Sequence, residues 1–145
     1  MNFFHAFRIS ASGMTAQRLR MNVATSNLAN IHTTRTRQGG PYRRKDVVFE
    51  TQPFPGSFRN TLKSAMARKL SGVKVSKIIE DPRPPISKYD PQHPDADKKG
   101  YIRVPRINLM EEMVNMMSAT RSYEANVTAI KATKDMAMKA LDIGR

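Results

Sequence analysis

The feature that most constrains this fold is a pair of heptad patterns, one near each end of the chain. Residues 4–28 and 109–141 carry mostly apolar side chains at alternating steps of three and four. This spacing places them on one helical face and favours packing against another helix at a shallow angle. At ~1.5 Å per residue, we expect helices about 37 and 50 Å long. The first pattern comprises Phe4, Phe7, Ala11, Met14, Arg18, Met21, Thr25 and Leu28; the second comprises Leu109, Met113, Met116, Thr120, Tyr123, Val127, Ile130, Lys134, Ala137 and Leu141.

A second apolar row lies beside the first pattern, at Ile9, Ala16 and Val23. It predicts a buried stripe wider than a two-helix seam. We expect this row to stay exposed in the isolated chain, because a few short strands could not cover it. Since isolated helices draw most of their stability from burial, both helices are expected to fold only on assembly.

The start of the C-terminal helix carries its own signals. Pro105 stops the preceding segment, and Asn108 with Glu111 forms a plausible capping box. Glu111 and Glu112 then lie at the positive end of the helix dipole, where acidic side chains are favoured. Six of the ten methionines lie in this helix, and methionine adapts to non-identical neighbours.

The middle of the chain is predicted to be β-rich and interrupted by proline. The runs DPRPP and DPQHP forbid helix and suit exposed turns. Three alternating segments are enough for one small sheet. These predicted strands are residues 42–51, 72–80 and 100–104, and a basic loop at 52–71 is expected to contain a short helix at 61–70.

The sequence therefore predicts a mainly α protein with a small β-rich middle. The long terminal helices are expected to pair as a coiled-coil-like hairpin with the β subdomain inserted between them. The expected division is 1–35 for the N-terminal helix and its closing signature, 36–105 for the middle, and 106–145 for the C-terminal helix.

The charge is unevenly distributed along the chain. The net charge is +13, and residues 1–79 hold 14 Lys and Arg against two acids. Such a basic half could bind nucleic acid, aid solubility or complement an acidic protein partner. The basic residues are scattered and are not interleaved with aromatic side chains, which a nucleic-acid stacking platform needs.

No catalytic or metal-binding constellation is evident. The chain has no Cys, and His5, His32 and His93 share no ligand spacing with one another or with acids. No glycine-rich phosphate loop is present. We therefore expect no enzyme activity, no cofactor and no metal. No stretch approaches the ~18 apolar residues of a membrane span, and the N-terminal residues do not form a Sec-type signal.

Two segments carry a family resemblance. Ala29-Asn30-Ile31-His32-Thr33 matches the A-N-x-x-T signature that closes the first helix of flagellar rod and hook axial proteins, and SNLAN at 26–30 is its usual lead-in. The segment 112–136, which includes RSYEAN, resembles the second signature of that family. The segments 41–50, 72–80 and 89–105 resemble the proximal rod type in particular.

The resemblance implies a structural subunit of the proximal rod in the bacterial flagellar basal body. Such a subunit assembles into a drive shaft that crosses the periplasm, encloses the export channel and is needed for motility. Implied partners are further copies of the chain, neighbouring rod proteins of the FlgB, FlgF, FlgG and FliE types, and the flagellar type III export apparatus. Export without a cleaved signal peptide is also implied. The alternatives are another rod or hook axial subunit, or a basic nucleic-acid-binding protein.

The predicted interface residues lie on the two helices and the closing signature. Asn27 and Asn30 could satisfy free carbonyl groups at the helix end or bond to the backbone of a neighbouring subunit. We expect the helical hairpin to line the inside of a tube. The predicted subunit-interface and helix-seam residues are Phe4, Phe7, Met14, Met21, Leu28, Asn27, Asn30, Thr33, Met113, Met116, Tyr123, Asn126, Val127, Ile130 and Leu141.

Overall fold

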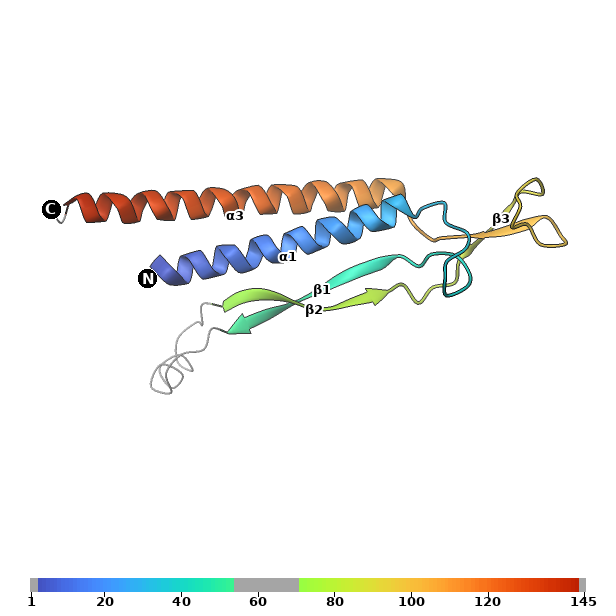
Figure 1. Ribbon diagram of the computed structural model, residues 1–145, viewed down its shortest axis with the longest axis horizontal. Coiled ribbons are helices and arrows are strands. Elements are labelled where there is room, and N and C mark those ends of the chain that lie inside the picture. The colour runs from blue at the N-terminus through green and yellow to red at the C-terminus, as the bar shows by residue number, and fades with distance from the viewer. Residues whose placement is uncertain (1–2, 54–70, 144–145) are drawn as a thin grey trace.

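The two heptad segments form two long helices that lie side by side. The computed structural model describes residues 3–53 and 71–143, with α1 at Phe3–Ala29 and α3 at Leu109–Ile143. The helices run antiparallel, so that both ends of the chain lie at the same end of an elongated molecule (Figure 1). The hydroxyl of Thr120 lies 3.4 Å from the sulfur of Met21 across this pair. The predicted helical hairpin is confirmed.

A long β-ribbon covers a second side of α1. β1 (Lys45–Pro53) pairs antiparallel with β2 (Ser71–Glu80), with Val47 opposite Ile78 and a bulge between Val48 and Phe49. The ribbon lies along α1, on the side away from α3 (Figure 1). The backbone N–H of Val73 donates to the Ser12 hydroxyl over 3.1 Å, which ties β2 to α1.

This ribbon corrects one expectation about the isolated chain. Ala16 is buried, and Ile9 and Val23 are half-buried, so the second apolar row does not stay exposed. The prediction was wrong because it treated the β-rich middle as a separate unit, whereas β1 and β2 run back along the length of α1. The helix α1 keeps one exposed stripe, which includes Phe4, Arg8 and Arg18.

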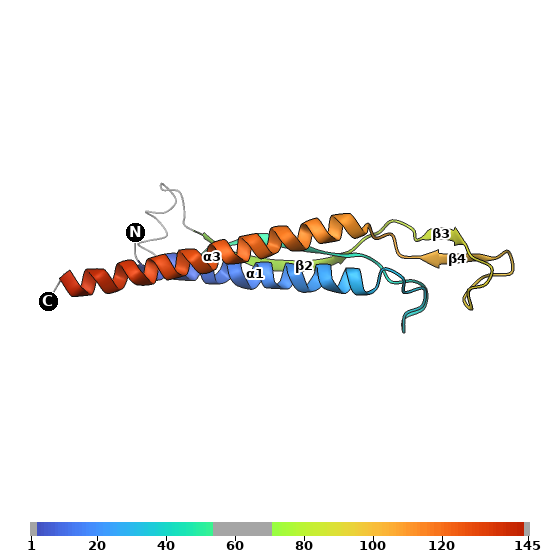
Figure 2. The ribbon, with the colours of Figure 1, turned by 90° about the horizontal axis from the view of Figure 1, so that it is seen from above.

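A second, shorter ribbon lies beyond the far end of the helices (Figure 2). β3 (Ile86–Tyr89) pairs antiparallel with β4 (Tyr101–Val104), with Ile86 opposite Val104. The described strands form two separate two-stranded sheets, and the expected single sheet of three strands is therefore wrong. β3 was missed because it has four residues between two proline-rich runs, which mask its β signal. The predicted helix at 61–70 and most of the loop 52–71 lie outside the described residues.

Asn108 caps the start of α3, which is one half of the predicted capping box. The side-chain oxygen of Asn108 accepts the backbone N–H of Met110 over 3.0 Å. This bond satisfies one of the free N–H groups in the first turn. Neither helix in the described part of the chain is long and apolar enough to cross a membrane.

The chain encloses very little apolar core. Among the described residues, the buried apolar side chains are Ala16, Ala24, Ile102, Pro105 and Ala119. The accessible surface is 11227 Å², whereas a compact monomer of this mass would expose about 7,500 Å². An extended molecule with so small a core leaves large parts of its helix faces exposed.

Candidate assembly interface

The most deeply buried positions of α3 lie one residue before three members of the predicted row, whereas the row members Met116, Tyr123, Val127, Ile130 and Ala137 are half-buried. Glu112, Ala119 and Thr133 are the buried residues of this helix, each one position before a predicted row member. Ala119 and Thr133 are small, which lets the helices approach closely at these two positions. Gly13 marks a close contact between the helices: a Cβ added there would lie 3.0 Å from Oδ1 of Asn126.

The predicted interface residues are distributed over three environments. Asn27 is fully buried within the chain, whereas Phe4 is 75% exposed. Met113 and Leu141, both on α3, are also exposed. The half-buried members are Phe7, Met14, Met21, Leu28, Asn30, Thr33, Met116, Tyr123, Asn126, Val127 and Ile130.

Asn27 forms a buried junction between three elements. Its side chain is 1% exposed and makes four hydrogen bonds, two as donor and two as acceptor. The amide nitrogen donates to the Lys45 carbonyl over 2.8 Å and to the Glu112 carboxylate over 3.0 Å. The amide oxygen accepts from the Lys45 N–H over 2.9 Å and from the Tyr42 hydroxyl over 3.1 Å. The full hydrogen-bonding capacity of Asn27 is thus used inside the chain.

An ion pair completes this junction. Nε of Arg44 lies 2.6 Å from Oε1 of Glu112, whose side chain is 2% exposed. Burial disfavours the charged guanidinium, but hydrogen bonds and charge attraction from Glu112 and Asp46 raise the pKa of Arg44 above its ordinary value. Sequence reasoning placed Glu112 at the helix dipole and missed its burial, since nothing in the sequence pairs it with Arg44.

The signature residues after Asn27 end α1 and turn the chain towards β1. The Asn30 amide donates to the Ser26 carbonyl over 2.8 Å, and the Thr33 hydroxyl donates to Oδ1 of Asn30 over 3.1 Å. The backbone N–H of Tyr42 then donates to the Thr33 carbonyl over 3.1 Å. Asn30 therefore caps its own helix, which was one of the two roles considered for it.

The helix α3 exposes large apolar side chains at both of its ends. Near its start these are Met110, Met113, Val114 and Met117, of which Met110 is 65% exposed. Near its end, α3 extends beyond the start of α1 (Figure 2). The exposed apolar side chains in this last part are Met136, Met138, Leu141 and Ile143. Such surfaces are typical of faces that a neighbour covers.

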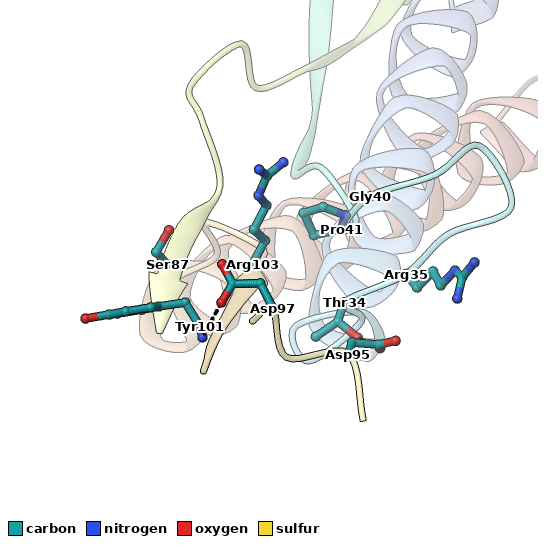
Figure 3. Close-up of a pocket in the computed structure, with 9 residues that line it drawn as sticks. All are labelled: Thr34, Arg35, Gly40, Pro41, Ser87, Asp95, Asp97, Tyr101 and Arg103. Carbon is teal, nitrogen blue, oxygen red and sulfur yellow. Dashed lines mark hydrogen bonds between the residues drawn. The ribbon is translucent and has the colours of Figure 1, made fainter. Parts of the chain in front are cut away.

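A cleft of about 680 Å³ lies between the turn after α1 and the β3–β4 hairpin. Figure 3 shows Thr34, Arg35 and Pro41 on one side, and Ser87 and Arg103 on the other. The Thr34 hydroxyl donates to Oδ2 of Asp95 over 2.7 Å and ties the hairpin loop to the turn. In the described part of the chain, no three His, Cys, Asp or Glu residues lie close enough together to hold a metal ion.

Comparison with known proteins gives a consistent result. Residues 7–35 match the family model described as flagella basal body rod protein, and residues 98–143 match the flagellar basal body rod FlgEFG protein C-terminal model. The flagellar basal-body rod protein FlgC of Bacillus subtilis is 49% identical, with all of both chains covered. FlgC of Borreliella burgdorferi is 44% identical over 99% of this chain and 98% of its own. FlgC of Salmonella typhimurium is 39% identical over all of both chains.

Proposed function

The chain belongs to the FlgC family of flagellar basal-body rod proteins, and on this premise we propose that it is a structural subunit of the proximal rod. Its membership confirms the family predicted from the two sequence signatures. The observation that carries the proposed role is the exposed apolar face of α3, on an elongated chain with almost no core of its own. A subunit of this kind gains most of its buried area by packing against its neighbours.

In the proposed assembly, α1 and α3 line the inner part of a tube and the β-ribbons lie outside them. The order of the layers supports this arrangement, because α1 lies between α3 and the β1–β2 ribbon (Figure 1). The exposed apolar side of α3 would then pack against a helix of an adjacent subunit. The predicted seam and interface residues, from Phe4 to Leu141, belong to this helical layer.

The proposed partners follow from membership of the rod family. They are further copies of the chain, rod proteins of the FlgB, FlgF, FlgG and FliE types, and the flagellar type III export apparatus. We propose that the assembled rod crosses the periplasm, transmits torque and encloses the export channel. Segments 1–35 and 106–145 would form the helical layer, and segment 36–105 would form the outer part.

The test is complementation of a flagellated strain that lacks this gene, with Met117→Asp as the informative variant. Met117 lies on the exposed apolar part of α3, where a charge would have to be buried on assembly. Gln92→Asp is the control, since Gln92 is an exposed polar residue in the loop after β3, outside the helical layer. We expect Met117→Asp to abolish rods and swimming, and Gln92→Asp to retain both. Normal swimming of Met117→Asp cells would contradict the proposed packing.

A further inference from the structure

The cleft between the turn after α1 and the β3–β4 hairpin is lined by two arginines, Arg35 and Arg103, and by two aspartates, Asp95 and Asp97. Its two carboxylates are already engaged: Asp95 accepts the Thr34 hydroxyl, and Asp97 accepts the N–H groups of Lys99 and Tyr101 over 2.8 and 3.0 Å. Arg103 lies near enough to Asp97 to help lower the pKa of that carboxyl, after the two backbone hydrogen bonds. Within the described residues, neither Arg103 nor Arg35 forms an ion pair.

An exposed aromatic side chain stands beside these cations. Tyr101 is 46% exposed and lies two residues from Arg103 on β4, so both project from the same face of the strand. Its ring packs edge-on against Tyr89, with centroids 5.3 Å apart. Tyrosine and arginine are the side chains that most often anchor protein interfaces.

The aromatic pair is held in place by the hairpin loop. Gly100 has φ +78°, a left-handed conformation that side chains rarely adopt. A Cβ added at Gly100 would also lie 2.9 Å from Cε2 of Tyr89. The loop is therefore built around the Tyr89 ring, which fixes Tyr101 in its exposed position before any partner binds.

We propose that this cleft docks an extended acidic segment of a different protein. In the view of Figure 3, Arg103 stands between Tyr101 at one rim and Arg35 at the other. A segment crossing the cleft would set a carboxylate on Arg103, an apolar side chain on Tyr101 and a second carboxylate towards Arg35. Charge-assisted bonds from arginine to carboxylate are the strong contacts of such a site.

A second copy of this chain does not fit the cleft. The chain carries a net charge of +13, and its adjacent acid pairs are Glu80–Asp81 and Glu111–Glu112. Three of these four carboxylates already form ion pairs: Glu80 with Lys45, Asp81 with Arg83, and Glu112 with Arg44. The described part of the chain therefore offers no free acidic run to its own copies.

Peptide binding by the full-length chain tests the charge preference. The probe is a capped peptide of alternating Glu and Ala, and its Lys and Ala counterpart is the comparison. Arg103→Ala should weaken binding of the acidic peptide roughly tenfold. Lys98→Ala removes the same charge from the same hairpin outside the cleft and should change binding less than about twofold. Equal losses in the two variants, or equal binding of the lysine peptide, would overturn the proposal.

Crosslinking in flagellated cells tests the identity of the occupant. A photoreactive amino acid at position 101 should capture a peptide rich in Asp and Glu from another protein. Capture of a segment of this same chain, or of a segment without acidic residues, would refute the assignment. Both experiments concern the hairpin and not the helices, so their failure would leave the proposed rod role standing.

Discussion

Nδ2 of Asn27, in the last turns of α1, lies 3.0 Å from Oε2 of Glu112, in the first turn of α3. The two residues are 85 positions apart in sequence. Because the same amide also bonds to both backbone groups of Lys45, one side chain fixes the relative positions of both helices and of β1. The SNLAN lead-in at 26–30 thus holds, in Asn27, an internal junction of the subunit.

The first prediction concerns this junction. Asn27→Leu keeps the approximate volume but leaves the backbone groups of Lys45 and one oxygen of Glu112 without their partners. We expect the free energy of unfolding to fall by roughly 2–4 kcal/mol, measured by urea denaturation. Asn22→Leu, at an exposed asparagine of the same helix, should change it by less than about 0.5 kcal/mol. Equal effects of the two substitutions would show that the junction contributes no particular stability.

The second prediction concerns the close approach of the helices. In most helix interiors, Gly→Ala stabilises by roughly 0.5–1 kcal/mol. At Gly13 the new Cβ would meet Asn126, whose amide is held by a 2.8 Å bond to the Ser122 carbonyl. We therefore expect Gly13→Ala to destabilise the wild-type chain but to stabilise an Asn126→Ala background. A double-mutant cycle on the unfolding free energy measures this coupling, and additive effects would contradict the contact.

The third prediction concerns acid sensitivity. Hydrogen bonds from the Arg83 side chain and backbone lower the pKa of Asp81 from 3.8 to about 2. Because the pKa is lower in the folded state, the pair adds stability above about pH 4, which is lost as the pH falls to about 2. In Arg83→Ala the NMR titration midpoint of Asp81 should rise towards its ordinary value, whereas Lys88→Ala should leave it unchanged. A midpoint unaffected by Arg83→Ala would rule out this pairing in solution.

The fourth prediction concerns the half-buried positions of the helical layer. Leu28→Asp and Val127→Asp each place a charge among packed side chains, which costs several kcal/mol. Each should abolish rod assembly and swimming, as judged by electron microscopy of basal bodies and by motility assays. Gln92→Asp, in the exposed loop after β3, should assemble normally. Rods built from either helix variant would exclude these residues from the packed layer.

The helices could be predicted from the sequence because their heptad spacing extends over many turns. The exact residues at the contact between the helices could not be predicted. Among them are Ala119, Thr133 and Gly13, whose small side chains do not stand out in a pattern of large apolar residues. The burial of Glu112 was equally hidden, because a charged residue at the start of a helix ordinarily faces solvent. Its partners Asn27 and Arg44 are brought to it only by the tertiary fold.

The sequence predicted that the middle of the chain forms β-strands, but not where those strands lie relative to the helices. The alternation of Val73 and Val75 with lysine marks β2 as a half-covered strand, yet it does not say which element covers it. The covering element is α1, and this depends on the direction in which the chain leaves the Asn27 junction. Likewise, the cleft at Arg103 joins residues from a turn and a hairpin that lie some 60 positions apart, as the bond between Thr34 and Asp95 shows.

Methionine footprinting tests most directly whether the open helix faces are covered by assembly. Peroxide transfers oxygen to an accessible thioether, giving the sulfoxide and water. In the isolated chain, Met110, Met117, Met136 and Met138 are exposed and should oxidise faster than the half-buried Met21. In purified basal bodies, the account predicts that oxidation of the four exposed methionines slows to the rate of Met21 or below. Oxidation of all four at the same rates in basal bodies as in the isolated chain would contradict it.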